Sequence, residues 1–324
     1  MKKVSFINVY KNYGIYILLL ALIVLFSVFA KNFFSVDNFI NILRQVSMLG
    51  IAVVGVTFVM ISGGADLSVG GQIAVNGLIT AMLMTQLNLP IFPTVLITMV
   101  IGTLMGALNG FIAVYLRIVP IIATLGTMLI WQGMASVISG GLAIFGLPEQ
   151  FKSLGQGYVW IIPIPVIIFI VIAAVSSFVL RKTYFARYLF AMGGNAEAAT
   201  LAGVNVPKMR ILVYALCGFI TSIAALIMLS RNNSAQPGAA ASYPFDCMTA
   251  AVLGGISFTG GEGKISGAII GVLIIGILNN GLLLMGVDSN WQEVIKGIVL
   301  IAAVGLDSLQ HRMGKTKHTK AIAS

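Results

Sequence analysis

The sequence predicts an all-α membrane protein of about ten transmembrane helices, with both termini in the cytoplasm. Three observations lead to this prediction: the composition, the length of the apolar runs and the distribution of the basic residues. Hydrophobic residues make up 59% of the 324 positions and charged residues 9%, whereas about a quarter of the residues of a soluble domain are charged. A large soluble helical domain would need a charged shell that this chain lacks.

The apolar runs have the length of membrane-crossing helices. They extend over about 17 to 25 residues and do not show the ten-residue alternation of outer-membrane strands. In chain order we expect spans near 14–30, 46–62, 67–86, 91–116, 119–139, 161–180, 211–230, 247–258, 265–285 and 291–308. Because many spans follow it, the first run is expected to be a retained signal anchor rather than a cleaved signal peptide.

The basic residues lie mostly on one side of the expected membrane. With an interior N-terminus, fourteen would face the inside: Lys2, Lys3, Lys11, Arg117, Arg181, Lys182, Arg187, Lys208, Arg210, Lys264, Arg312, Lys315, Lys317 and Lys320. Only Lys31, Arg44 and Lys152 would face the outside, and Arg231 and Lys296 lie at span edges. This excess places both termini inside. Residues 1–13 are therefore expected to form a cytoplasmic N-terminus, 14–308 the membrane domain and 309–324 a basic cytoplasmic tail.

The net charge of +10 is explained by this topology and by contact with anionic lipid headgroups, and requires no nucleic acid. Cys217 and Cys247 are expected to be buried core residues rather than a disulfide or metal ligands. His311 and His318 lie in the polar tail, where solvated side chains are expected. No catalytic Ser/His/Asp grouping is present, and no metal or cofactor site is predicted.

Glycines at four-residue spacing are expected to pack helices closely in the membrane. In lipid, association depends on small residues that let backbones approach one another. Gly102, Gly106 and Gly110 share one face of the fourth expected span, and Gly267 and Gly271 share one face of the ninth.

The stretch "MISGGADLSVGGQ", Met60 to Gln72, places a carboxylate between two apolar spans. An ionised carboxylate at the bilayer centre costs about 3 kcal/mol, so Asp66 needs hydrogen-bond donors or water nearby. The glycines favour an unwound turn, and Asp66 is expected to cap the helix that follows it. Irregular backbone at membrane depth requires burial in protein or contact with water, so the turn should lie inside the protein or at a cytoplasmic mouth.

A polar stripe follows this turn. Ser68, Gln72, Asn76 and Thr80 recur every fourth residue on one face of the third span. Two interpretations remain open: hydrogen bonding between helices, or the lining of a wet pathway for a neutral, hydroxyl-rich solute. Further uncharged polar residues within the spans are Asn109, Thr124, Thr127, Gln132, Asn279 and Asn280.

The longest expected interior loop, 181–210, contains a second informative pattern. Asn195 is expected to cap a short helix that runs through Glu197, Ala198 and Ala199 and stops near Gly203. From the residues alone, this helix could lie on the membrane surface or dock in a groove of a soluble partner.

Four motifs in this order resemble one family of importer permeases. They are "GGADLSVGG" (63–71), "AMGGNAEAATLAGVNV" (191–206), "AAVLGGISFTGGEGKISGAIIGVLIIGILNNGLLLMGV" (250–287) and "WQEVIKGIVLIAAV" (291–304). The chain resembles the ribose/xylose/arabinose/galactoside and autoinducer-2 family of ABC-importer permeases over about 33–304.

The resemblance implies a ten-span permease of the vitamin-B12-importer type (type II) in the bacterial inner membrane. It also implies partners: a cytoplasmic ABC ATPase, an extracytoplasmic sugar-binding protein and a second permease copy, in a homodimer or heterodimer. The family's pattern of Glu-Ala-Ala, three residues and Gly falls on Glu197, Ala198, Ala199 and Gly203, and implies that this short helix couples the permease to the ATPase.

The expected function is import of a monosaccharide, by a permease that is not itself an enzyme. The segment "GGEGKIS" lacks the Walker A spacing, so ATP would be bound by partner subunits. The residues expected to form or to pack the pathway are Asp66, Ser68, Gln72, Asn76, Asn109, Asn279 and Asn280. Alternatives are an importer permease for a branched-chain amino acid or a nucleoside, and a self-sufficient channel or secondary transporter.

Overall fold

The computed structural model describes residues 6–322, except the side chains of 6–13, 306 and 309–322. The expectations for the side chains of Lys2, Lys3 and Lys11 and of the tail 309–324 therefore lie outside the described residues. The described part contains thirteen helices: α1 (Phe6–Phe29), α2 (Val36–Ile61), α3 (Val69–Thr85), α4 (Ile91–Tyr115), α5 (Pro120–Ser139), α6 (Glu149–Gln156), α7 (Ile164–Lys182), α8 (Tyr184–Gly194), α9 (Ala196–Leu201), α10 (Val206–Asn232), α11 (Tyr243–Leu253), α12 (Ile265–Leu284) and α13 (Ser289–Ile322).

Two very short antiparallel strand pairs accompany the helices. Strand β1 (Ile144–Phe145) pairs with β4 (Ser234–Ala235), and β2 (Tyr158–Val159) pairs with β3 (Ile162–Pro163). Each strand has two residues, so these two-stranded pairs only fasten loops. The all-helical prediction is confirmed.

Among the residues that the structure describes, six helices are long and apolar enough to cross a membrane: α2, α4, α5, α7, α10 and α12. Shorter apolar stretches are 14–29 of α1 and the whole of α3. Each expected span coincides with a helix, but α2 begins at Val36 rather than near residue 46. The reason is a cap: the Ser35 hydroxyl accepts a hydrogen bond from the Asn38 amide at 3.2 Å.

The span expected near 247–258 contains a short helix, α11, that begins four residues earlier and ends at Leu253. Helix α11 has 11 residues and at 1.5 Å per residue reaches about 16 Å, roughly half the hydrocarbon thickness. It starts with Pro244 in its first turn and is followed by Gly254, its C-cap residue, and by Gly255 with a φ of 78°. Loops on both sides of α11 therefore continue the chain through the bundle.

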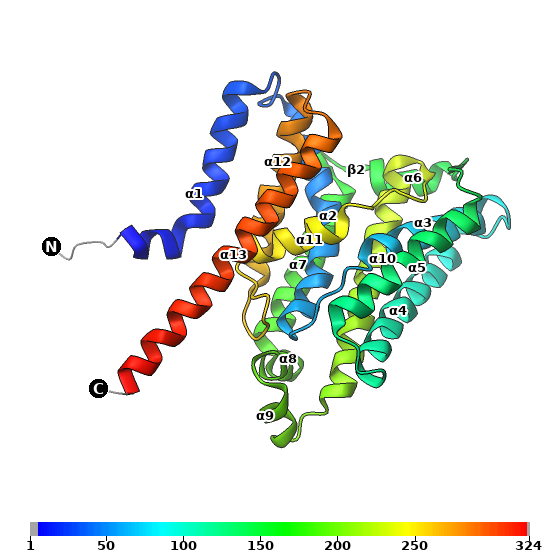
Figure 1. Ribbon diagram of the computed structural model, residues 1–324. Coiled ribbons are helices and arrows are strands. Elements are labelled where there is room, and N and C mark those ends of the chain that lie inside the picture. The colour runs from blue at the N-terminus through cyan, green and yellow to red at the C-terminus, as the bar shows by residue number, and fades with distance from the viewer. Residues whose placement is uncertain (1–5, 323–324) are drawn as a thin grey trace.

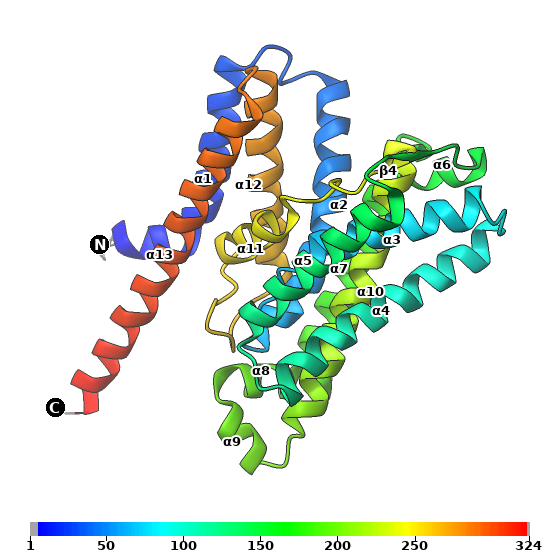
Figure 2. The same cartoon turned by 45° about the vertical axis from the view of Figure 1, so that its right-hand side comes forward.

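Helix α2 lies at the centre of the bundle. It packs against α7, α10, α11 and α12, and 83% of the residues in its apolar 18-residue stretch are buried. In one part of the molecule α1 packs against α12 and α13 packs against α11, and α3, α4, α5 and α10 form the other part (Figure 1). The view turned by 45° shows the same division, with α2 between the two groups (Figure 2).

The glycine faces bring helices into close contact, as their spacing predicts. Helix α10 packs most extensively against α4, where a side chain on Gly106 would overlap the backbone of Tyr214 and Gly218. A side chain on Gly271 would likewise overlap the carbonyl oxygen of Ala250, at the α11–α12 contact. These contacts have the close backbone approach that stabilises helix pairs in lipid.

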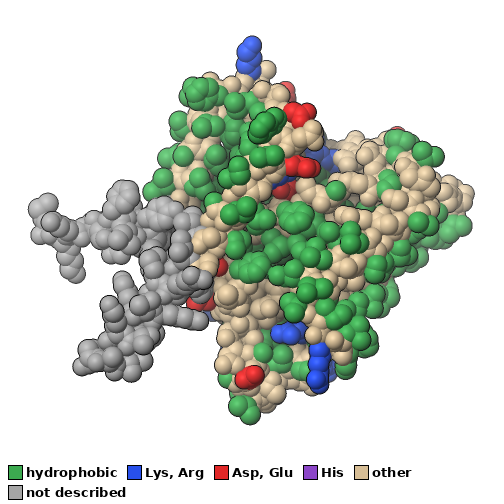
Figure 3. Space-filling view, in the orientation of Figure 1, with side chains coloured by type: hydrophobic (Ala, Val, Ile, Leu, Met, Phe, Trp, Pro, Cys, Tyr) green, Lys and Arg blue, Asp and Glu red, His purple; other side chains and the backbone are tan. Residues whose placement is uncertain are grey.

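The two ends of the bundle differ. Helices α8 and α9 form a small knob at one end, here called the lower end after its position in Figure 1. At the upper end, α6 is fastened to α10, because the Ser230 hydroxyl accepts from the Gly155 amide at 2.7 Å and donates to the Phe151 carbonyl oxygen at 2.6 Å. Hydrophobic side chains cover much of the flank, and basic side chains are seen near both ends (Figure 3).

Candidate functional site

The turn 62–68 joins α2 to α3 and is held by contacts from other helices. Gly63 has a φ of 78°, a conformation that favours glycine. The carbonyl oxygen of Ala65 accepts from the Tyr214 hydroxyl of α10 at 2.9 Å and from the Thr124 hydroxyl of α5 at 3.3 Å. The unwound turn is therefore buried in protein, as expected of irregular backbone in a membrane protein.

Asp66 is fully buried in this turn. Its Oδ1 accepts from the Ser68 amide at 2.9 Å, the Ser68 hydroxyl at 2.6 Å and the Asn109 side-chain amide at 3.5 Å. Helix α3 begins only at Val69, with Ser68 as its N-cap residue and no side-chain capping bond. The expectation that Asp66 caps α3 is therefore wrong: Asp66 closes an Asx-type turn in front of the helix.

The polar stripe continues this network along α3. The Ser68 hydroxyl accepts from the side-chain amides of Gln72, at 2.7 Å, and Asn109, at 2.6 Å. One turn further, Asn76 donates to the Gln72 carbonyl oxygen at 2.9 Å, and the hydroxyls of Thr80 and Thr98 lie 2.7 Å apart. Because Asn109 and Thr98 belong to α4, the stripe joins α3 to α4 by hydrogen bonds.

Every member of this network is fully buried within the single chain. Four oxygens of the network have no hydrogen-bond donor among the described residues: Asp66 Oδ2, Gln72 Oε1, Asn76 Oδ1 and Asn109 Oδ1. Buried polar atoms normally have partners, and leaving one unpaired costs about 1–3 kcal/mol. The network therefore has more acceptors than donors and is suited to groups that donate, such as hydroxyls.

The residues predicted to form the coupling helix fold as the sequence suggests. Asn195 caps α9, since its Oδ1 accepts from the Ala198 amide at 2.9 Å. At the other end, the Gly203 amide bonds the Thr200 carbonyl and the Val204 amide bonds the Ala199 carbonyl, each at 3.0 Å. This pair of bonds, with a φ of 86° at Gly203, is a Schellman motif.

One face of α9 is anchored and the other is free. Ala199 is buried in the main core together with Leu189 and Met192 of α8. Glu197 is exposed, and Leu201 is 90% exposed at the tip of the knob. A rigid, capped helix that presents an apolar tip beyond the membrane bundle has the form of a docking element.

A close backbone contact connects the knob to the Asp66 turn. A side chain on Gly193 of α8 would overlap the carbonyl oxygen of Ile61, the last residue of α2. The same oxygen accepts from the Gly261 amide at 2.9 Å. Three of the four sequence motifs therefore meet at this point, which we call the glycine junction: Ile61, Gly63, Gly193 and Gly261.

The two asparagines of α12 have different surroundings. Asn280 and Asn38 of α2 exchange two side-chain hydrogen bonds, at 2.8 and 3.0 Å, and so fasten α12 to α2. Asn279 is half-buried, and its Oδ1 has no donor among the described residues. Neither asparagine joins the network of Asp66, so the structure does not bring all the predicted pathway residues together.

A buried ion pair was missed by the sequence reasoning. Lys296 of α13 lies 3.2 Å from Asp246 of α11, and their side chains are 19% and 5% exposed. The Ser242 hydroxyl also donates to Asp246, at 3.2 Å. The available signal was an acidic and a basic residue inside two apolar runs, where an ionisable residue normally has a partner or a function.

Within the described residues, no group of three or more His, Cys, Asp or Glu side chains could hold a metal ion. Cys217 and Cys247 are free and buried. The site thus offers uncharged polar groups inside a helix bundle, one buried carboxylate and an external knob. These features define the chain as a multi-span membrane protein with a buried, uncharged polar network suited to contact with a solute.

Comparison with known proteins identifies the family. Residues 38–304 match the family described as "Branched-chain amino acid transport system / permease component". The chain is 42% identical to the ribose import permease protein RbsC of Haemophilus influenzae over 90% of this chain and 92% of the relative. It is 39% identical to RbsC of Bacillus subtilis over 94% and 95%, and 36% identical to the galactose/methyl galactoside import permease protein MglC of Escherichia coli over 97% and 99%.

No solved structure matches the chain. The family match and the relatives show that the chain belongs to this permease family. It is a non-catalytic membrane component of an ABC importer, with several apolar helices in the bacterial inner membrane. The resemblance seen in the four motifs is confirmed.

Proposed function

We propose that this chain forms the membrane pathway of an ATP-driven importer for a monosaccharide: a ribose-like pentose, a hexose or a related polyol. The observation that carries the proposal is the 42% identity, over nearly the whole chain, to a ribose import permease. The acceptor-rich network around Asp66 supports it, because a sugar presents many hydroxyl donors. Free energy from ATP would come from partner subunits, since this chain has no nucleotide-binding motif.

The proposed topology has ten crossings of the vitamin-B12-importer type (type II). The crossings are α1, α2, α3, α4, α5, α7, α10, α11 with its flanking loops, α12 and α13. Arg117, Arg181, Lys208 and Lys264 fall at the lower ends of their helices, which by the positive-inside rule is the cytoplasmic side. Residues 1–13 and 309–324 would then both be cytoplasmic.

The knob of α8 and α9 is the proposed contact with the cytoplasmic ATPase. Asn195 and Gly203 fix the two ends of α9, Ala198 and Ala199 form its middle, and Glu197 faces outward. Because α9 is anchored through Ala199 and α8 touches α2 at the glycine junction, movement of the ATPase can be passed to the Asp66 turn by rigid elements.

The proposed mechanism is alternating access. In the conformation described, the stripe of Ser68, Gln72 and Asn76 is closed between α3 and α4. Separation of these helices would expose the stripe together with Asp66 and Asn109 to a passing solute. Weak contacts of this kind favour passage, because a tight site would retain the solute. Asn279 and Asn280 would contribute nearer the upper end.

Two further partners complete the proposal. An extracytoplasmic binding protein would deliver the sugar at the upper end, and a second permease copy, identical or related, would complete the pathway. Specificity for one sugar would rest mainly with the binding protein.

The test is reconstitution in liposomes of the permease with its ATPase and its binding protein. Uptake of labelled ribose, galactose, leucine and a nucleoside is measured with ATP and with an ATPase variant that cannot hydrolyse it. ATP-dependent accumulation of a sugar supports the proposal. Accumulation of leucine or the nucleoside alone would favour another solute, and uphill accumulation by the isolated permease would favour a self-sufficient transporter.

A further inference from the structure

A cavity of about 370 Å³ opens at the lower end of the molecule, separate from the Asp66 network. It lies between the turn that joins α4 to α5 and the first turn of α10. Two arginines line it, Arg117 of the turn and Arg210 of α10, and the other lining residues are aliphatic side chains or prolines, including Ala113, Val114, Ile118 and Val206. No acidic side chain lines the cavity.

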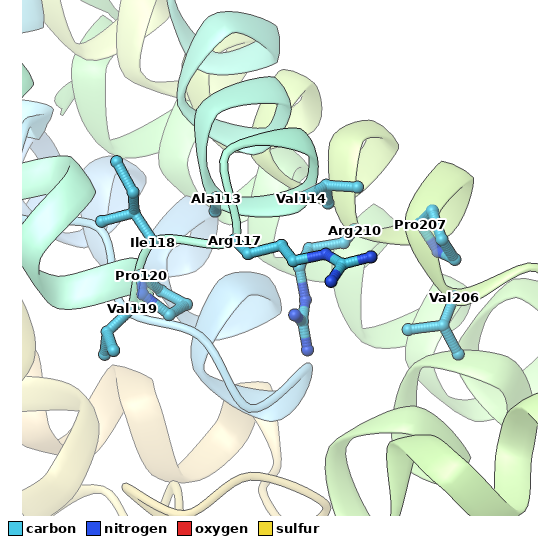
Figure 4. Close-up of a pocket in the computed structure, with 9 residues that line it drawn as sticks. All are labelled: Ala113, Val114, Arg117, Ile118, Val119, Pro120, Val206, Pro207 and Arg210. Atoms are coloured by element: carbon cyan, nitrogen blue, oxygen red, sulfur yellow. The ribbon is translucent and has the colours of Figure 1, made fainter.

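The two arginines have no anionic partner among the described residues. Both guanidinium groups project into the same open space between α4 and α10 (Figure 4). Among the described residues, neither has an ion pair or a side-chain hydrogen bond, and Nε of Arg210 is buried without an acceptor. An anion bound in the cavity would supply the acceptor that these two cations lack.

The surroundings of the cavity are apolar and face outward. Tyr115, Leu116, Val119 and Ile122 are each about 60% exposed on the α4–α5 side, and Leu212 on the α10 side is 50% exposed. Such a surface at the end of membrane-crossing helices is suited to lipid. The cavity therefore joins two arginines to an apolar flank, as the headgroup and the acyl chains of a phospholipid require.

We propose that this cavity binds the phosphate of an anionic phospholipid from the cytoplasmic leaflet, with Arg117 and Arg210 as its ligands. Arginine suits this task because its planar group can donate two parallel hydrogen bonds to phosphate oxygens. The proposal rests on the orientation proposed above, since the cytoplasmic leaflet is the one that carries anionic lipids in excess. Bound there, the lipid holds the α4–α5 turn against α10.

A docked acidic segment of the ATPase is the alternative occupant. The aliphatic lining and the exposed apolar flank favour lipid, because a solvated acidic segment gains nothing from them. The exposed tip of α9, at Leu201, already offers the ATPase a separate contact.

The experiment measures thermal unfolding of the purified full-length permease in an uncharged detergent, with phosphatidylglycerol added in steps. Phosphatidylcholine and inorganic phosphate are titrated in parallel. The variants are Arg117→Gln, the double variant Arg117→Gln/Arg210→Gln and the charge-keeping double variant Arg117→Lys/Arg210→Lys. The matched control is Arg181→Gln/Lys208→Gln, which removes two exposed charges from the same end but none from the cavity.

Phosphatidylglycerol should raise the unfolding temperature of the wild type and of the control at the same lipid concentration. The phosphatidylglycerol concentration that gives half of the full temperature shift should rise about fivefold for Arg117→Gln and about 25-fold for the Gln double variant. Each arginine near anionic lipid contributes a factor of about five to lipid affinity. The Lys double variant, which keeps both charges, should lose less affinity for phosphatidylglycerol than the Gln double variant does. Because Arg117 is exposed, the single variant should fold even if the Gln double variant does not.

Three results would overturn the proposal. The first is an unchanged lipid midpoint in Arg117→Gln and in the Gln double variant. The second is an arginine-dependent response to inorganic phosphate alone, which would make the cavity a site for free anions. The third is a Gln double variant that loses co-purification with the ATPase and keeps its lipid response, which would make the cavity a protein-docking surface.

Discussion

Gly193 of α8 lies directly against the carbonyl oxygen of Ile61, so closely that no side chain could stand at position 193. Ile61 ends α2, the central helix, and is followed at once by the turn that carries Asp66. Gly193 in turn lies two residues before Asn195, the cap of α9. The contact therefore connects the external knob to the buried network over a few residues of backbone.

This contact predicts that Gly193→Ala will disconnect ATP hydrolysis from transport. The added methyl group must displace α8 from α2, at a cost of about 1–3 kcal/mol for overpacking. In the reconstituted complex, sugar uptake should fall at least about tenfold, since a change of 1.4 kcal/mol alters an equilibrium by that factor. ATPase activity should persist, because the partner's own active site is unchanged.

The control for this prediction is the neighbouring glycine. A side chain on Gly194 would meet nothing within 4 Å, so Gly194→Ala should keep wild-type uptake. Equal uptake by the two variants would show that the glycine junction carries no coupling.

A second prediction concerns the tip of the knob. Leu201 is 90% exposed, so covering it with a partner would bury apolar surface and stabilise the complex. Leu201→Gln should weaken co-purification of the ATPase about tenfold, the effect of losing one apolar anchor at an interface. The unfolding temperature of the permease alone should not change.

Val159→Gln is the matched control for Leu201, because it makes the same change at an exposed apolar residue of the upper end, on strand β2. It should leave ATPase binding intact. If Leu201→Gln binds the ATPase as tightly as the wild type does, α9 does not dock through its tip.

Much of the fold could be predicted because lipid imposes a simple rule on helices. The lengths of the apolar runs predicted the bounds of α4, α5, α7 and α12 within a few residues, because each of these helices occupies one apolar run between two turns. Helix α11 could not be predicted by length, because its apolar run continues past Gly254 into a loop in which Ile256 and Ser257 are buried. Burial in protein satisfies that backbone, and a single sequence does not reveal it.

The candidate site could be predicted in part, for a similar reason. Local signals, such as the Asn195 cap and the Gly203 stop, depend on neighbouring residues and were confirmed in the structure. The contacts of Asp66 and the pairing of Asp246 with Lys296 depend on helices far apart in the sequence, so spacing alone did not reveal them.

A third prediction tests whether the stripe contacts the solute or only packs helices. Asn76 Oδ1 has no donor, and its amide group bonds the carbonyl oxygen of Gln72. Asn76→Leu should therefore change the free energy of unfolding by less than about 1 kcal/mol, because no strong partner is lost. Uptake should nevertheless fall several-fold, since one polar contact along the proposed pathway is removed.

Gln72→Leu should behave in the same way, because Ser68 keeps its bond from Asn109. Thr85→Val is the control: Thr85 lies on α3 outside the network and bonds only the Ala81 carbonyl oxygen. Wild-type uptake in both leucine variants would leave the stripe a purely structural feature.

The last prediction concerns the ion pair that ties α11 to α13. Removing one partner of a buried pair leaves an uncompensated charge, which costs about 3–5 kcal/mol. Asp246→Asn and Lys296→Met should each destabilise the permease by an amount near the lower end of that range, because Lys296 is 19% exposed. Thermal unfolding of the purified chain in detergent would measure both losses.

The double variant Asp246→Asn/Lys296→Met decides whether the pair itself is responsible. With both charges gone, no buried charge lacks a partner. The loss of unfolding free energy in the double variant should therefore be smaller than the sum of the two single losses, by at least about 1 kcal/mol. The reference is the double variant Glu149→Gln/Lys152→Met, at an ion pair near the surface whose Glu149 is 85% exposed. Losses there should be small and additive, as at surface pairs. Additive losses at Asp246 and Lys296 would mean that each residue acts through other contacts, and that α11 is held in the bundle by its packing against α12 rather than by its charge.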